Sequence, residues 1–331
     1  MKSSISVCIP TFNQAQYLKK AVLSAWEQDF KPDEILVYND ASTDETLQVL
    51  EDLARVVPVL KFYSQPVNKG ISGNVEDCLR AATGDYIVRL DSDDFIHPRY
   101  IQEMVSALDL YADAGYAHCA IQEIDEHDNP TRLRKLARKS GFETAEIALR
   151  KSVYGYKVAA NILTFRKSCL AELNYSMGRP SYVEDYHLSV AMADAGFGNV
   201  YLDEVLASYR IWLDAGMVRQ RRKILEIKGV AEVFKEQIVP AFKARNWNLK
   251  PVYREMGRKA RRQANCLSWD AYSKSEKGEL LELLKELSDT NHSNRIYQLY
   301  LHDQGWIYDG LQKLKNAPKL FLKKLLYKAR K

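Results

Sequence analysis

The sequence has no apolar run long enough to cross a membrane as a helix and no paired-cysteine motif. A spanning helix needs about 18 consecutive apolar residues, and no stretch of the 331-residue chain approaches that length. The five cysteines are scattered and never form a C-x-x-C pattern. We therefore expect reduced thiols in a cytoplasmic protein, without a disulfide framework or a zinc site. The N-terminus runs directly into a strand-like segment, so no signal peptide is expected.

Glycine-rich phosphate loops, internal repeats and low-complexity tracts are also lacking. The first predicted strand is followed by Pro10-Thr11-Phe12-Asn13. Dinucleotide-binding enzymes have a G-x-G-x-x-G turn at this place, so a dinucleotide-dependent oxidoreductase is disfavoured. With 46% hydrophobic and 27% charged residues, the composition is that of an ordinary globular protein and excludes a disordered or fibrous chain.

Charge is unevenly distributed along the chain. Residues 1–130 carry 10 basic and 22 acidic side chains, a net charge of −12, whereas residues 131–331 carry 38 basic and 21 acidic side chains, a net charge of +17. This division suggests two functions in two places, and the alternative is a solvated surface of uneven charge.

The first 95 residues alternate short apolar strands with amphipathic helical stretches. Strands are predicted at 4–10, 34–39, 60–64 and 86–90, each of them buried, and helical stripes at 17–26 and 47–54. Such alternation implies right-handed strand–helix–strand crossovers and a mostly parallel sheet. Ligands of these sheets bind at the carboxyl ends of the strands, so the polar residues after each strand are the first candidates for a site.

The pattern is less regular after residue 95. Strands are predicted at 116–123, 161–165, 199–202 and 205–211, helices at 99–112 and 184–195, and a basic exposed segment at 132–139. From residue 215 onward only helical patterns occur, at 221–245, 251–266, 276–289, 294–302 and 305–327. A domain boundary is therefore expected near residue 213.

Three carboxylates lie together in Asp91-Ser92-Asp93-Asp94, directly after the predicted strand 86–90. Carboxylates this close repel one another unless solvent, hydrogen bonds or a cation compensates. Mg²⁺ and Mn²⁺ prefer oxygen ligands, and Mg²⁺ usually binds one or two carboxylates together with substrate phosphates. The arrangement suits a metal–diphosphate site, and the alternative is an acidic turn in which Asp94 caps the next helix.

Four segments after the predicted strands occur in a characteristic order, namely 6–13, 39–44, 68–70 and 84–94. They resemble the motifs of family 2 glycosyltransferases, which are inverting enzymes of the GT-A fold that use nucleotide-sugar donors, and the chain is similar to the bacterial surface-polysaccharide type. A fifth segment, Val183-Glu184-Asp185-Tyr186, falls where this family has its Glu-Asp pair. The resemblance covers about residues 4–212. It implies an α/β/α sandwich with a mostly parallel sheet at 1–213, comprising a nucleotide-binding half (1–95) and an acceptor half (96–213), followed by a helical region at 214–331.

The resemblance also assigns residues to the donor. Pro10 and Thr11 would lie beside the nucleobase, and Asp40 would accept a hydrogen bond from it. For uracil that bond comes from the ring N3–H, so a UDP-sugar is the favoured donor. Asn68 and Lys69 would form a turn near the nucleotide, with Lys69 either facing phosphate or simply exposed.

Asp91 would contact ribose or sugar hydroxyls, and Asp93, the second aspartate of a D-x-D motif, would hold Mn²⁺ or Mg²⁺ on the diphosphate. Many family members have Tyr-Arg-x-His near the end of the catalytic domain, where this chain has Tyr209-Arg210-Ile211-Trp212. Arg210 would contact diphosphate or acceptor, and Trp212 would pack at the domain junction or stack on a sugar ring. The missing histidine leaves a catalytically silent nucleotide-sugar- or glycan-binding protein of the same fold as the alternative.

Inverting transfer needs a carboxylate that takes the proton of the acceptor hydroxyl as it attacks. Asp185 matches the family's base, and Glu184 lies beside it. Both begin the predicted helix 184–195, whose dipole stabilises anions at this end. The alternative is that Asp185 only caps that helix.

The last 19 residues, 313–331, contain eight basic side chains and no acidic one. Leucines and a phenylalanine recur there at helical spacing, a pattern typical of helices that bind anionic membrane surfaces, and the alternative is a helix docked on the protein. No nucleic-acid module accompanies the basic residues, so no nucleic-acid partner is expected. We expect a cytoplasmic hexosyl- or N-acetylhexosaminyl-transferase, peripheral at the inner face of the membrane, acting on a glycan or glycolipid acceptor.

Overall fold

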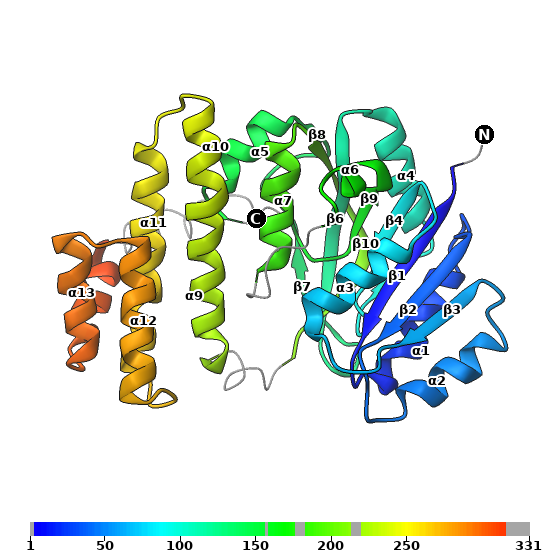
Figure 1. Cartoon of the computed structure of the whole chain (residues 1–331), viewed down its shortest axis with the longest axis horizontal. Coiled ribbons are helices and arrows are strands. Elements are labelled where there is room, and N and C mark those ends of the chain that lie inside the picture. The colour runs from blue at the N-terminus through cyan, green and yellow to red at the C-terminus, as the bar shows by residue number, and fades with distance from the viewer. Residues whose placement is uncertain (1–2, 156–157, 176–182, 213–219, 316–331) are drawn as a thin grey trace, which may run out of the picture. The chain divides into compact units, whose positions relative to one another are not determined.

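The structure is a computed structural model that describes residues 3–155, 158–175, 183–212 and 220–315. The chain divides into two compact units, Met1–Leu213 and Asp214–Lys331. Strands and helices alternate in the first unit, whereas the described residues of the second are helical (Figure 1).

The first unit is built on a ten-stranded sheet. Its strands are β1 (Ile5–Thr11), β2 (Glu34–Asn39), β3 (Leu60–Ser64), β4 (Tyr86–Arg89), β5 (Phe95–Ile96), β6 (Ala114–Ile124), β7 (Pro130–Arg134), β8 (Gly141–Glu143), β9 (Leu163–Arg166) and β10 (Gly198–Arg210). They follow the order β3-β2-β1-β4-β9-β6-β10-β5, with β7 beside β6 and β8 beside β10. The first four strands are parallel neighbours, β6 and β10 are parallel, and β9 runs antiparallel between β4 and β6. The mostly parallel sheet predicted from the sequence is confirmed.

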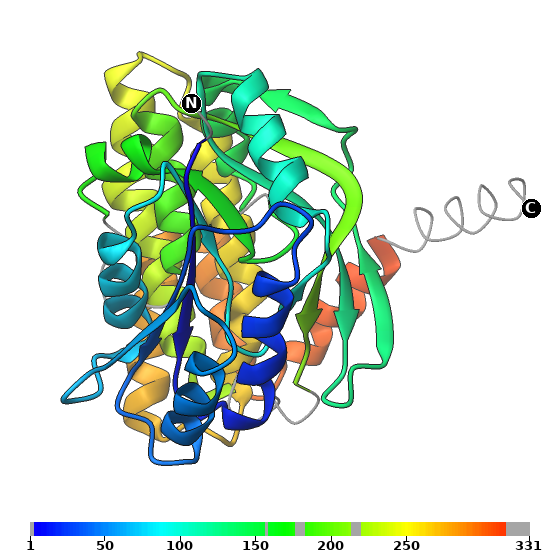
Figure 2. The ribbon, with the colours of Figure 1, turned by 90° about the vertical axis from the view of Figure 1, so that its right-hand side faces the viewer.

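Helices cover both faces of this sheet. One face carries α1 (Ala15–Trp26), α2 (Thr46–Ala54) and α4 (Tyr100–Leu110), and the other carries α3 (Gly70–Ala81), α6 (Lys167–Glu172) and α7 (Glu184–Asp194). Strand β1 shows the reason, because Val7 and Ile9 belong to the first apolar core and Cys8, between them, belongs to the second. In Figure 2, α3 lies on one side of β1 and α1 on the other. A further helix, α5 (Ala145–Ser152), packs against α7.

Two features of the predicted strands were wrong. Strand β3 is an edge strand in which only Leu60 is buried, not a buried one. The two strands predicted at 199–202 and 205–211 form the single strand β10, whose pairing with β6 shifts register after Leu202, as at a β-bulge. The basic segment predicted to be exposed at 132–139 is exposed or half-buried along its length, and its first residues lie in β7, which pairs with β6.

The described part of the second unit consists of helices joined by short connections. It comprises α9 (Lys223–Glu232), the π-helix η1 (Val233–Ile238), α10 (Val239–Ala244), α11 (Lys250–Gln263), the 3₁₀-helix η2 (Ala264–Ser268), α12 (Lys274–Leu287), α13 (Asn291–Leu301) and helical residues 305–315. The single helix predicted at 221–245 is interrupted by η1 just before Pro240, whose nitrogen has no hydrogen to donate.

Among the described residues, none of the helices has the length and apolarity needed to cross a membrane. Most of the amphipathic tail predicted at 313–331 lies outside the described residues, which end at 315.

Candidate active site

The polar segments that follow β1 and β2 meet at one edge of the sheet. Because these strands are parallel neighbours, the segments that follow them leave the sheet at the same edge. The backbone N–H of Asp40 donates to the Thr11 carbonyl at 2.9 Å, and the N–H of Asn13 donates to Ser42 Oγ at 2.9 Å. Asn13 and Ala41 adopt left-handed φ angles of 51° and 56°. The two turns therefore form one connected surface.

Asp40 joins this surface to α3. It is 2% exposed, and its two carboxylate oxygens accept the backbone N–H groups of Lys69 at 2.7 Å and Gly70 at 2.9 Å. Asn68 Nδ2 donates to the Asp40 carbonyl at 3.2 Å, and Lys69 Nζ pairs with Asp77 at 2.5 Å. A carboxylate at a helix N-terminus is stabilised by the free N–H groups there. The predicted grouping of Asp40 with Asn68 and Lys69 is thus present, but a uracil N–H has to share the oxygens of Asp40 with the backbone.

Thr11 has a buried hydroxyl without a partner. The residue is 3% exposed, and Oγ1 forms no hydrogen bond within the part of the chain that the structure describes. Buried hydroxyls are normally paired, so this one is available to a ligand or to water. Its neighbours are the partly exposed Pro10 and Phe12, which is 45% exposed and suited to packing against a flat ring. Pro10 and Thr11 were predicted as site residues, whereas Phe12, which belongs to the same motif, was not.

Asp91 and Asp93 are both partly exposed at the end of β4. Asp91 Oδ1 accepts a hydrogen bond from Arg89 Nε at 3.3 Å. Asp93 Oδ2 accepts the indole N–H of Trp212 at 2.9 Å. Burial and the charge of Asp91 raise the pKa of Asp93.

Asp94 is buried, and its Oδ1 accepts the backbone N–H of Arg210 at 2.8 Å, while its Oδ2 has no partner among the described residues. Burial and the charge of Asp93 raise the pKa of Asp94 well above its usual value. The negative charge of this cluster is therefore incompletely compensated, which favours a cation. Within the described ranges, no three His, Cys, Asp or Glu side chains are arranged to hold a metal ion. The residues thus fit a cation bound by one or two carboxylates and completed by phosphate oxygens and water, as Mg²⁺ usually is.

The side chain of Arg210 supports this cluster from within the protein. The residue is 3% exposed, and its Nε donates to the Asp93 carbonyl at 2.9 Å. Its Nη1 donates to the Asp125 carbonyl at 2.6 Å and its Nη2 to Asp128 Oδ1 at 2.6 Å. The guanidinium also lies 4.1 Å from the centre of the Tyr17 ring. Arg210 thus joins the carboxylate segment to the turn after β6.

Replacing Arg210 with methionine is expected to lower the free energy of unfolding by about 2–3 kcal/mol, because the carbonyls of Asp93 and Asp125 lose a charged donor. Urea denaturation measures this loss. Lys20→Met is the control, because it removes the surface ion pair with Asp128 and the contact of Lys20 Nζ with the Phe95 ring, each worth about 1 kcal/mol or less. Equal losses in the two variants would contradict a supporting role for Arg210.

Trp212 is part of the surroundings of the carboxylate cluster. Besides donating its indole N–H to Asp93, it packs edge-on against Tyr17, with ring centroids 5.4 Å apart and planes at 80°. Its side chain remains 37% exposed. The described contacts of Trp212 therefore lie within the first unit, beside the aspartate predicted to hold the metal.

Asp185 lies at the start of α7 and binds Arg89 of β4. Nη1 of Arg89 donates to Asp185 Oδ1, and Nη2 lies 4.0 Å from Glu184 Oε1. Arg89 is 2% exposed and Asp185 7% exposed. Because Arg89 Nε also reaches Asp91, one guanidinium connects the carboxylate after β4 with the pair at the start of α7.

Asp185 accepts a hydrogen bond from Arg89 and does not act as the cap of its helix. The N-cap position of α7 is Val183, and no side chain caps this end. Val183 has a φ angle of 87°, which is rare for a β-branched residue and indicates local strain. Burial raises the pKa of Asp185 to about 7, an effect that Arg89 opposes and Glu184 reinforces. A carboxylate with a pKa near neutrality is well suited to accept a proton.

Arg89 was not predicted as a site residue, because it stands within the apolar strand predicted at 86–90. The available signal was the charge itself, because a guanidinium in a strand buried on both faces requires an anionic partner. That partner lies 96 residues further along the chain, so local patterns do not identify it.

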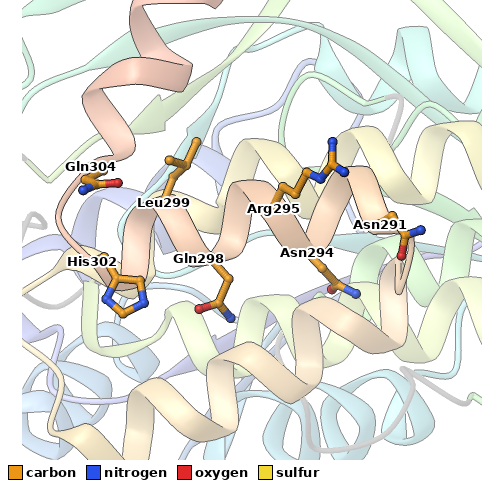
Figure 3. A pocket seen from close by; sticks show the side chains of 7 residues that line it. All are labelled: Asn291, Asn294, Arg295, Gln298, Leu299, His302 and Gln304. Carbon is orange, nitrogen blue, oxygen red and sulfur yellow. The ribbon is translucent and has the colours of Figure 1, made fainter.

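A separate cavity of about 680 Å³ lies in the second unit. It is lined by Asn291, Asn294, Arg295, Gln298, Leu299, His302 and Gln304. Figure 3 shows that these side chains extend from α13 and from the turn that follows it. The lining contains no carboxylate, so it does not offer the groups needed to hold a metal–diphosphate or to deprotonate a hydroxyl.

Known proteins share both the motifs and the fold. The family described as "Glycosyl transferase family 2" matches residues 6–171, which is half of the chain. A GalNAc(5)-diNAcBac-PP-undecaprenol beta-1,3-glucosyltransferase of Campylobacter jejuni is 36% identical over 115 residues, covering 34% of this chain and 36% of that enzyme. The match thus spans about a third of the length of this relative.

Two solved structures resemble most of the chain. S. aureus TarS 1-349 in complex with UDP-GlcNAc has a TM-score of 0.58 at 16% identity, covering 91% of this chain and 92% of that one. The mannosyltransferase PcManGT from Pyrobaculum calidifontis, in complex with GDP-Man and Mn²⁺, has a TM-score of 0.57 at 18% identity, covering 91% and 85%. These likenesses establish the fold, and the family match establishes the membership. The chain belongs to the family 2 glycosyltransferases and has the GT-A fold.

Proposed function

We propose that the protein is an inverting glycosyltransferase that moves a sugar from a UDP-sugar to a hydroxyl of a glycan or lipid-linked glycan, with Asp185 as the general base. The observation that carries this proposal is the guanidinium of Arg89, which ties Asp185 to the strand end that bears Asp91 and Asp93. A proton acceptor and an oxygen-rich cation site thereby share one edge of the sheet.

The donor is proposed to bind along this edge. Pro10, Thr11 and Phe12 would lie beside the base, because Thr11 has an unpaired hydroxyl and Phe12 an exposed ring. Asp40 and the turn at 68–69 would border the base and the diphosphate. Asp91 would contact sugar or ribose hydroxyls. This part of the proposal assigns Arg210 to the support of Asp93, and not to the donor.

A divalent cation, Mn²⁺ or Mg²⁺, would be held by Asp93 and completed by diphosphate oxygens. When bound, it supplies positive charge beside the departing nucleotide. The incompletely compensated charge of the aspartate cluster supports this assignment, and the structurally similar mannosyltransferase is described with Mn²⁺.

The proposed reaction is a single displacement. Asp185 takes the proton of the acceptor hydroxyl while the hydroxyl oxygen bonds to the anomeric carbon. The bond between that carbon and the diphosphate oxygen breaks on the opposite face of the sugar, and the nucleotide diphosphate leaves with the electron pair. The anomeric configuration is therefore inverted. The negative charge of Glu184 makes Asp185 a stronger base, because it raises the pKa of Asp185.

A lipid-linked acceptor is proposed because the name of the Campylobacter jejuni relative includes "PP-undecaprenol", a polyprenyl diphosphate. The eight basic side chains of 313–331 would add about 1 kcal/mol each near an anionic membrane surface. The enzyme would then work as a peripheral protein at the cytoplasmic face of the membrane.

A thermal-shift panel of UDP, GDP, UDP-glucose, UDP-GlcNAc and GDP-mannose, each with Mn²⁺ or with EDTA, tests the donor assignment. At 100 times Kd a ligand stabilises by about 2.7 kcal/mol, or about 5–10 °C for a unit of this size. We expect shifts with the uridine compounds in Mn²⁺ only. A larger shift with GDP-mannose would contradict the UDP assignment, and a UDP shift that survives EDTA would contradict the role of the cation.

A further inference from the structure

Arg89 occupies an unusual place for a charged residue. It lies in β4, in register with Cys8 of β1 and Leu163 of β9, and is 2% exposed. The effective cost of burying such a charge is several kcal/mol, and an apolar side chain of similar size often packs equally well. Its retention at the centre of the sheet therefore suggests a purpose besides stability.

The hydrogen bonds of Asp185 indicate that purpose. Arg89 binds Oδ1 of Asp185, and the described part of the chain provides no hydrogen-bond partner for Oδ2. The carboxylate is thus held by one oxygen, and the other is left for a ligand. A general base needs this arrangement, because the accepting oxygen must lie within hydrogen-bond distance of the acceptor hydroxyl.

We propose that Arg89 is the positioning residue of the base, fixing Oδ1 of Asp185 so that Oδ2 receives the proton. The same guanidinium holds Asp91, the predicted contact of the donor, at 3.3 Å. Arg89 thereby fixes the positions of Asp185 and Asp91 relative to each other. The inference rests on the proposed function of Asp185 as base.

Charge gives the inference a second consequence. The largest charge effects on Asp185 come from Arg89 of β4, Glu184 of α7 and Asp91 after β4. Glu184 and Asp91 are negative, so Arg89 is the one of these three groups that favours the ionised base. Without the charge of Arg89, Asp185 keeps its proton up to a higher pH. Activity should therefore appear only at more alkaline pH.

The test compares the full-length variants Arg89→Met and Arg89→Lys with Arg166→Lys as the matched control. Arg166 lies in the neighbouring strand β9, opposite Tyr86 at the other end of β4, and donates to the carbonyls of Leu108 and Ala114. Release of UDP from UDP-GlcNAc and from UDP-glucose is followed from pH 5 to 9, together with UDP affinity and thermal unfolding. Asp185→Asn is measured in parallel.

Both Arg89 variants are expected to lose about 10²-fold in rate, because a misplaced catalytic group costs on this order. Arg89→Met should also move the acidic limb of the pH profile from near 7 to higher pH, and Arg89→Lys should move it less because the charge is kept. Arg166→Lys should leave the limb in place even if it lowers stability. If Arg89→Met does not fold, the rate of Arg89→Lys and the acidic limb of its pH profile test the positioning role.

The positioning role of Arg89 and the base role of Asp185 are contradicted by different results. An inactive Asp185→Asn combined with Arg89 variants of normal rate and unchanged acidic limb would overturn the positioning role and leave the base assignment intact. An active Asp185→Asn would overturn the base assignment itself, whatever the Arg89 variants do.

Discussion

Replacing Asp185 with asparagine is expected to slow sugar transfer by about 10²–10⁴-fold, the usual contribution of a positioned general base, while UDP binding stays within a few-fold of wild type. Asparagine keeps the shape of the side chain and an oxygen for the Arg89 donor, so α7 should stay in place. It cannot accept the proton of a hydroxyl. Release of UDP from a UDP-sugar gives the rate, and calorimetry gives the affinity for UDP with Mn²⁺.

Asp113→Asn is the matched control for this variant. Asp113 is exposed and immediately precedes β6, which runs parallel to β4 because each is antiparallel to β9. It therefore lies at the edge of the sheet opposite to Asp185, and its neutralisation should leave the rate unchanged. Wild-type turnover by Asp185→Asn would show that another group takes the proton.

Replacing Asp93 with asparagine is expected to abolish the dependence of UDP binding on Mn²⁺ and to slow transfer by about 10²-fold or more. A metal ion contributes several kcal/mol to stabilising charge in the transition state, and each 1.36 kcal/mol is about a factor of ten in rate. We expect the remaining aspartates not to replace it, because Asp91 is paired with Arg89, and Asp94 is buried and bonded to the backbone of Arg210. UDP affinity is measured in a Mn²⁺ titration, and the rate by UDP release.

Trp212→Phe controls for disturbance of the same carboxylate. This variant removes the hydrogen bond from the indole to Asp93 Oδ2 and leaves both carboxylate oxygens in place, so the Mn²⁺ requirement should persist. If UDP binding by Asp93→Asn still depends fully on Mn²⁺, the cation is held by other ligands. The same conclusion follows if Trp212→Phe loses this dependence and Asp93→Asn keeps it.

The central strands of the sheet were predictable because they are short apolar runs bounded by polar turns, whereas the strands β5, β7 and β8 were not predicted. β2 and β3 begin and end where predicted. Helix α3 was missed because its first turns contain Gly70, Ser72, Gly73 and Asn74, which are weak helix formers. Its start is stabilised instead by Asp40, 30 residues earlier in sequence from Gly70, and that contact exists only in the folded chain.

The candidate site was predictable only in part, for a similar reason. The motifs placed Asp93 and Asp185 after β4 and at the start of α7, and the structure has them there. The position of Arg210 was also foreseen, but its bonds to Asp93, Asp125 and Asp128 depend on how β10 meets the turn after β6. Sequence motifs indicate which residue types stand at the strand ends, whereas the partner of each buried charge depends on long-range packing.

The stereochemistry of the transferred sugar is the most direct measurement of the proposed mechanism. ¹H NMR of the sugar that the enzyme releases from UDP-GlcNAc or UDP-glucose into water, recorded before the anomers equilibrate, identifies the anomer formed first. A single displacement assisted by Asp185 predicts that the β-anomer appears first from these α-linked donors. The α-anomer appearing first would contradict an inverting displacement and the role of Asp185 in it.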